Sequence, residues 1–198
     1  MSKMEFKYNR MFLCLSLLLL IIYGCSHSVS PQINYRCNYR PLLNFNPVAV
    51  VYSVGGSANE KPYAAIADTL EMNLPSLGFR TVSRKEIRSI LNEQIFQISG
   101  LTEQQLIKLG KMVGARAIII INVTNYYKSP DLDLVNIMLG INKEGSRVSF
   151  FMKMIDAETT NVVWSAFAQF PEDVVATPEM ATQVLVNAIM EKMQECLH

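Results

Sequence analysis

Hydrophobic positions along residues 47–82 predict two strands with a helix between them. The run at 47–54 is apolar, short and rich in β-branched residues, which is typical of a strand buried on both faces. Glycines interrupt it, and apolar residues then recur at helical spacing from Tyr63 to Leu77. Pro62 suits the first turn of this helix and Gly78 its end, and a second short strand follows at 79–82.

Two capping patterns predict the next two helices. Ser83 is followed three residues later by Glu86, and Thr102 is followed three residues later by Gln105. In both cases the hydroxyl and the side chain of the third residue can satisfy free N–H groups at a helix start. Apolar residues at helical spacing follow each pattern, and Gly114 is placed to end the second helix.

The rest of the chain predicts three strands and a final helix. The run at 117–123 is the most hydrophobic segment of the mature chain and predicts a central, buried strand. The runs at 148–155 and 162–170 predict an antiparallel hairpin, and Thr177 precedes an amphipathic helix. The resulting order is β-α-β-α-α-β-β-β-α. It predicts an α/β (α+β) fold, with a mixed β-sheet flanked by helices.

The N-terminus has the pattern of a bacterial lipoprotein signal peptide. Lys3, Lys7 and Arg10 precede an apolar run at 11–23, and a glycine then precedes Cys25. Cys25 fits the lipobox cysteine that becomes the acylated first residue of the mature protein. The run is shorter than the about 20 residues that a spanning helix needs. An uncleaved N-terminal membrane anchor is the alternative interpretation.

This interpretation sets the domain organisation and the location. We expect a signal peptide at 1–24, a lipid-anchored tether at 25–44, which is polar and has no helical period, and one domain at 45–198. Ser26, rather than aspartate, follows the cysteine, which in Gram-negative lipoproteins implies the outer membrane, with the domain facing the periplasm. The outer membrane is then a partner through the covalent lipid on Cys25, and no other cofactor is expected.

Two cysteines remain in the mature chain besides the acylated one. Cys14 leaves with the signal peptide, whereas Cys37 and Cys196 lie near opposite ends of the domain. In an oxidising compartment these two can form a disulfide. Two separate thiols are equally compatible with the sequence.

The side chains of most catalytic and metal sites are missing. The only histidines are His27 in the tether and His198 at the last position, so a histidine-based triad is excluded. No Cys/His cluster has metal-binding spacing, and the near-balanced charge gives no basic patch for nucleic acid. We therefore expect a non-enzymatic protein without a metal. An enzyme with a histidine-free site is the alternative, and no motif supports it.

Several linked sequence blocks resemble the CsgG-like family. That family includes the curli production assembly/transport lipoprotein, and its fold is shared by activator lipoproteins of penicillin-binding proteins and by ring lipoproteins of exopolysaccharide export. The resemblance covers about Pro47 to Met193. The blocks are Val82 to Arg84, Ile90 to Gln94, Ser99 to Leu101, Leu109 to Lys111, Gly114 to Ile119, Ile155 to Thr159 and Val162 to Ser165.

The resemblance implies a role in the cell envelope. It implies an oligomeric scaffold or adaptor in secretion or assembly, whose partners are other copies of the chain and envelope secretion or assembly proteins. Alternatives are a regulator or activator of a peptidoglycan synthase and a secretion pore subunit. The pore is disfavoured because the segment between Phe170 and Thr177 is too short for a second membrane hairpin.

Two local features complete the expectations. Thr160 stands where the family's hairpin usually carries glycine, so we expect Asn161 to adopt the positive φ of the turn. The segment 128–147 has alternating apolar residues that no core element claims, and we expect a protein contact there. Its folding back as an extra strand or short helix is the alternative. The candidate contact residues are Leu132, Leu134, Ile137, Leu139 and Ile141.

Overall fold

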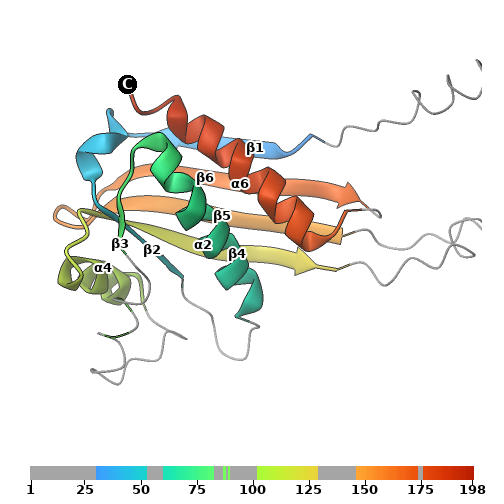
Figure 1. Ribbon diagram of the computed structural model, residues 1–198, viewed down its shortest axis with the longest axis horizontal. Coiled ribbons are helices and arrows are strands. Elements are labelled where there is room, and N and C mark those ends of the chain that lie inside the picture. Colours follow the sequence, from blue (N-terminus) through green and yellow to red (C-terminus); the bar gives the residue numbers. More distant parts are fainter. Residues whose placement is uncertain are drawn as a thin grey trace, which may run out of the picture.

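The computed structural model describes residues 30–52, 60–82, 87, 89, 102–128, 146–173 and 176–198. Within these residues a single sheet of six strands runs in the order β1-β6-β5-β4-β2-β3 (Figure 1). The strands are β1 (Gln32–Cys37), β2 (Val48–Tyr52), β3 (Thr81–Val82), β4 (Ala117–Tyr127), β5 (Ser146–Asp156) and β6 (Val162–Asp173).

The sheet is mixed, as the sequence predicts. Strand β2 pairs in parallel with both β3 and β4, whereas the β4–β5, β5–β6 and β1–β6 pairs are antiparallel. Every residue of β2 is buried, which confirms a strand covered on both faces. The fold is therefore α+β, with a parallel part at one side of the sheet and an antiparallel meander at the other.

Two helices cover one face of the sheet. Helix α2 (Lys61–Asn73), extended by the 3₁₀ turn η2 (Leu74–Leu77), packs on β2 and β4, and α6 (Pro178–Gln194) packs on β5, β6 and β1. Figure 1 shows both helices crossing in front of the strands. Their apolar stripes and the inward residues of the strands form the larger core, in which Trp164 is fully buried.

Helix α4 (Glu103–Met112) lies on the opposite face. The predicted cap is present: Gln105 N donates to Thr102 Oγ1 at 3.4 Å, and Thr102 N donates to Gln105 Oε1 at 2.7 Å. Leu106 and Leu109 pack with residues of β2 and β4 in a second, smaller core. A Cβ at Gly110 would lie 2.2 Å from Ile118 Cγ1, so only glycine permits this close approach of helix and sheet.

Most other predicted elements are confirmed. Gly78 adopts a left-handed φ of 87° at the end of η2, and Thr177 Oγ1 accepts from Met180 N at 3.2 Å at the start of α6. Of the helix predicted after Ser83, only Ile87 and Ser89 are described, and both are helical. None of the helices among the described residues combines the length and the apolar character needed to cross a membrane.

The structure corrects the expectation that residues 25–44 form a tether. Residues 32–37 form β1, which pairs with β6 over its whole length, and η1 (Leu42–Phe45) buries Leu42 completely. The sequence hides this strand because β1 is a sheet edge and is exposed along most of its length, so it carries few apolar residues. Within β1, only Ile33 and Cys37 pack against the larger core.

Candidate functional site

Several strands begin or end at the same end of the sheet, which we call the entry end. The register pairs Gln32 with Gln169, Ser146 with Asp173, and Tyr127 with Arg147. Strands β1 and β5 therefore begin at this end, and β4 and β6 stop there, at the right of Figure 1. Helix α6 also begins close to it, at Pro178.

Both segments that the sequence singles out for contact leave from the entry end. Cys25 precedes the first residue of β1 by seven positions, and the segment 128–145 connects the end of β4 to the start of β5. Neither Cys25 nor Leu132, Leu134, Ile137, Leu139 and Ile141 belong to the described residues. Their roles stay predictions, but the sheet fixes where their segments meet the domain.

Exposed apolar and partly buried aromatic side chains lie near the entry end, together with polar ones. Met180 of α6 is 61% exposed and Val184, one turn further, is 39% exposed. Tyr126 packs against the larger core, where burial raises the pKa of its hydroxyl, and the charge of Glu179 acts in the same direction. Among the described residues, this end of the molecule offers apolar contact area and the Tyr126 hydroxyl.

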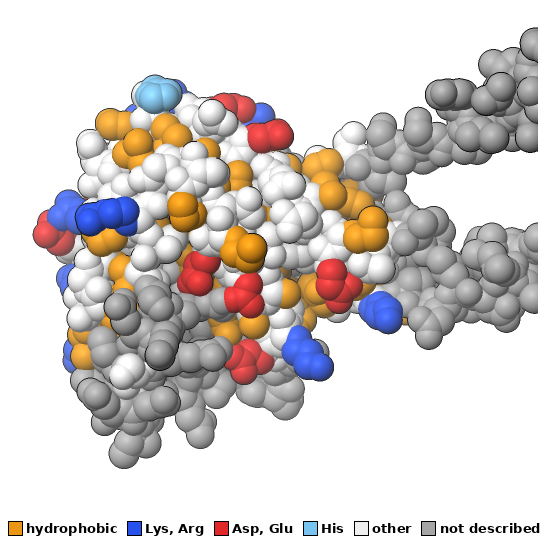
Figure 2. Space-filling view, in the orientation of Figure 1, with side chains coloured by type: hydrophobic (Ala, Val, Ile, Leu, Met, Phe, Trp, Pro, Cys, Tyr) orange, Lys and Arg blue, Asp and Glu red, His pale blue; other side chains and the backbone are white. Residues whose placement is uncertain are grey.

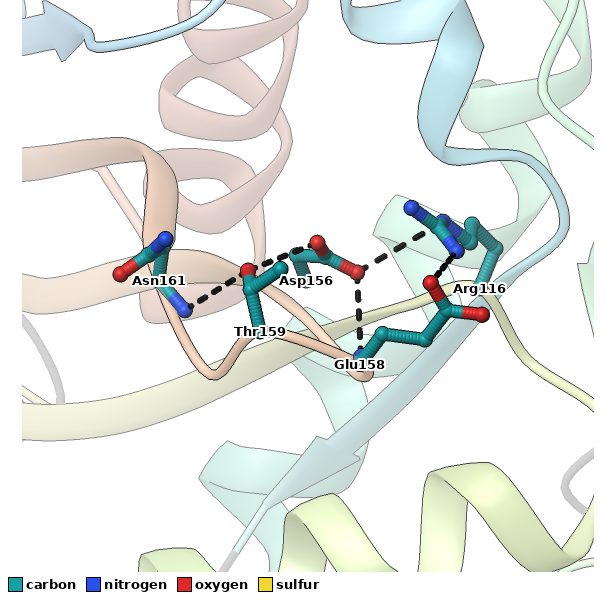
Figure 3. A network of polar contacts seen from close by, with 5 residues as sticks. All are labelled: Arg116, Asp156, Glu158, Thr159 and Asn161. Atoms are coloured by element: carbon teal, nitrogen blue, oxygen red, sulfur yellow. Dashed lines mark hydrogen bonds and ion pairs between the residues drawn. The ribbon is translucent and has the colours of Figure 1, made fainter.

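The opposite, turn end of the sheet holds a polar network (Figure 3). Asp156 is almost completely buried and accepts hydrogen bonds from Glu158 N at 3.1 Å and from Thr159 Oγ1 at 2.7 Å. Arg116 pairs with both Asp156 and Glu158. Burial raises the pKa of Asp156, but the hydrogen bonds and the Arg116 charge outweigh it and leave that pKa below its usual value.

This network corrects the prediction for the turn. Thr160, and not Asn161, adopts the positive φ, at 62°. Two backbone hydrogen bonds close the turn. Thr160 N donates to Asp156 O, and Asp156 N donates to Asn161 O, which fixes the length of the loop. The hydrogen bond from Thr159 to the Asp156 carboxylate lies inside the turn. The positive φ therefore falls at Thr160, one residue before Asn161, although asparagine tolerates this conformation better than threonine. The contacts of this network join the β5–β6 turn to Arg116 at the start of β4.

The structure joins Cys37 and Cys196 in a disulfide, with the two Cα atoms 6.1 Å apart. Beside it, Tyr35 Oη donates to Glu195, and Lys192 Nζ donates to the same carboxylate at 2.6 Å. The hydrogen bonds from Lys192 and Tyr35 lower the pKa of Glu195. These bonds attach the edge strand β1 to the C-terminal end of α6.

The described residues contain no group of three or more His, Cys, Asp or Glu side chains placed to hold a metal. His198 is exposed at the chain end, and His27 lies outside the described residues.

The sequence interpretation missed one surface, on the side of β5 and β6 away from α6. Phe151 and Phe167 are direct partners across these strands, are partly buried, and belong to neither core. A signal for this face is present in the sequence. Alternate residues of 147–155 point to the two sides of the strand, and the set that contains Phe151 is otherwise mostly polar.

Comparisons with known proteins show the fold. No family model matches the sequence, and a search of curated proteins finds no match. The dodecamer of PelC from Paraburkholderia phytofirmans is similar in structure, with a TM-score of 0.56 and 14% identity over 83% of this chain and 97% of that chain. Lipoprotein GNA1162 from Neisseria meningitidis has a TM-score of 0.53 and 14% identity, over 76% of this chain and 99% of that chain. The CsgG-like resemblance itself stays a prediction.

Proposed function

We propose that this chain is a non-enzymatic, lipid-anchored lipoprotein of the outer membrane that serves as an assembling scaffold in envelope secretion or export. The convergence at the entry end carries this proposal. The predicted lipid attachment at Cys25 and the predicted contact segment 128–147 both meet the domain at the same end of the sheet. A contact segment beside the anchor is placed to meet partners at the membrane surface.

The short reach of the chain strengthens this orientation. Between Cys25 and β1 lie only the six residues 26–31, so the Cα atoms of Cys25 and Gln32 can be at most about 25 Å apart. The entry end therefore stays close to the membrane. A regulator that works on a synthase beyond the peptidoglycan layer would need a longer tether, so the scaffold is the better-supported role.

Two further observations support assembly without a barrel of the chain's own. The similar PelC structure is a dodecamer, and the similar Neisseria protein is a lipoprotein. Strand β6 ends at Asp173 and α6 begins at Pro178, which leaves too few residues for a second pair of spanning strands of about 9–11 residues each.

The test of anchoring is Cys25→Ser in full-length protein, followed by metabolic labelling with a radioactive fatty acid and membrane fractionation. We expect loss of label and either release of the protein or accumulation of an uncleaved precursor. A labelled, membrane-bound Cys25→Ser variant would contradict the anchoring.

The test of the contact segment is the substitution of Leu134, Ile137 and Leu139 by lysine, with the mass of the assembled protein as the readout. We expect weaker association with copies or partners, because charges replace apolar contacts. Lysine at Ser129, Asn136 and Asn142, three polar positions of the same segment, is the matched control and should have little effect. Unchanged assembly of the Leu134/Ile137/Leu139 variant would remove the segment from the proposal.

A further inference from the structure

The surface formed by α2 and α6 is acidic and has exposed apolar residues. Asp68 is exposed on α2, and Glu179 and Glu191 are exposed on α6. Among the bases, Lys61 is at the start of α2 and Lys192 is bound to Glu195. Figure 2 shows acidic and apolar side chains together across this side of the molecule. Met72 is 82% exposed here, and the exposed Met180 and Val184 add to the apolar area. We call this surface the helix face.

The opposite surface is the open face, formed by the sides of β1, β5 and β6 that point away from α6. Ile33, Tyr35 and Cys37 of β1 point toward α6, so strand alternation places Asn34 and Arg36 on the open face. The register aligns Asn34 with Phe167 and Phe167 with Phe151, which gives an apolar centre with polar surroundings.

The open face and the adjacent helix α4 carry positive charge. Arg36 is exposed at the β1 edge, and Lys108 and Lys111 are exposed on the outer side of α4. Lys153 of β5 is paired with Glu103 of α4 and adds no net charge. Over the described residues, bases therefore exceed acids on this side and acids exceed bases on the helix face. The formal net charge of the whole chain is only +1.

From this separation of charge we infer that copies of the chain associate head to tail. The helix face of one copy binds the open face of the next. The inference rests on the proposed function, because it assumes that copies assemble. Pairing like faces would bring like charges together, whereas pairing unlike faces brings acids opposite bases around two apolar centres. Such a contact uses two different surfaces, so it repeats from copy to copy and closes into a ring when the rotation between copies permits.

Reversing the charge of each face tests this arrangement. The helix-face variant is Glu179→Lys with Glu191→Lys, and the open-face variant is Arg36→Glu with Lys108→Glu. The natively lipidated variants are compared in mild detergent by light scattering over a range of concentrations. We expect each variant to raise the concentration of half-assembly at least about tenfold. The chain carrying all four substitutions should return to the wild-type value, because its faces are complementary again.

Arg80→Glu, compared with Arg36→Glu alone, is the matched control. Arg80 is exposed directly before β3, near the turn end, and the two single variants make the same change in net charge. The inference is overturned if this control weakens assembly equally, or if the four-substitution chain assembles no better than the two-substitution variants. If the wild-type protein assembles and the charge-reversed variants assemble equally well, these two faces are not the interface, and the proposed function still stands. Wild-type protein that never assembles would reject both.

Cysteine crosslinking gives an independent test of direction. Gln169→Cys places a thiol on the open face, and Val184→Cys places one on the helix face, while Cys37 and Cys196 are bonded to each other. With a bifunctional thiol reagent, we expect crosslinked dimers when the two variants are mixed and none from either variant alone. Dimers formed by one variant alone would show that like faces meet and would overturn the head-to-tail arrangement.

Discussion

Thr160 is the residue at which the backbone conformation least suits its side chain. Its φ of 62° lies in the left-handed region, where a β-branched residue is disfavoured. The turn tolerates this because Asp156 binds Glu158 N and Thr159 Oγ1, and because Arg116 pairs with the same carboxylate. The buried carboxylate thus holds a turn that its own sequence would not favour.

The first prediction concerns this position. Thr160→Gly should stabilise the protein by about 1 kcal/mol, because glycine adopts the left-handed region without the steric cost of a side chain. The matched control, Asn161→Gly, should give no gain, because that residue does not have a positive φ. Urea unfolding of the two variants makes the comparison, and a gain for Asn161→Gly alone would contradict the assignment.

The second prediction concerns Glu71, whose partial burial on α2 raises its pKa from 4.5 to about 7. The folded state binds this proton more tightly than the unfolded state. The stability that Glu71 contributes is therefore fully present below pH 4.5 and is lost as the pH rises toward 7.

Glu71→Gln should remove this pH dependence. We expect the free energy of unfolding of the variant, relative to wild type, to rise by on the order of 2 kcal/mol across this pH range, allowing for the partial exposure of the group. The measurement is urea unfolding at a series of pH values. Parallel pH profiles for variant and wild type would contradict the prediction.

At the scale of elements, the helices and strands that bury an apolar face are the ones that the sequence pattern predicts. Helices α4 and α6 begin directly after their capping residues, Thr102 and Thr177, and strands β2 and β4 coincide with apolar runs. These elements were therefore predictable. Strand β1 was not, because it is a polar edge strand that gains its order from pairing with β6 and from the attachment to α6.

The third prediction tests the close contact between α4 and β4. Gly110→Ala should destabilise the protein by about 1 kcal/mol or more, because the added methyl overlaps Ile118 and outweighs the better helix propensity of alanine. In an Ile118→Ala background the same change should cost much less. A double-mutant cycle measures this coupling, and additive effects would show that the contact is not as close as described.

The fourth prediction tests the attachment of β1. The disulfide between Cys37 and Cys196 spans 159 positions of the sequence, so its loss should lower the free energy of unfolding by on the order of 5 kcal/mol. Unfolding with and without reductant measures this loss, and the double variant Cys37→Ala/Cys196→Ala should not respond to reductant. Two reactive thiols in the unreduced, denatured protein would contradict the pairing.

At the scale of the whole molecule, the order of elements predicted an α+β fold and the comparisons with PelC and GNA1162 agree with it. The two faces were less accessible to sequence reasoning. Arg36, Lys108 and Glu191 are far apart along the chain, and only the tertiary arrangement sorts them by sign onto opposite sides of the sheet. The entry end likewise emerges from strand register, since it joins the starts of β1 and β5 with the ends of β4 and β6.

The central claim is that this chain is an anchored lipoprotein that assembles with copies of itself. The most direct test is the mass and shape of the natively lipidated, full-length protein in mild detergent, by light scattering and negative-stain microscopy. The account predicts a discrete assembly of many copies, seen as a closed ring with its lipid-bearing side on one rim. A stable monomer at all concentrations would contradict it.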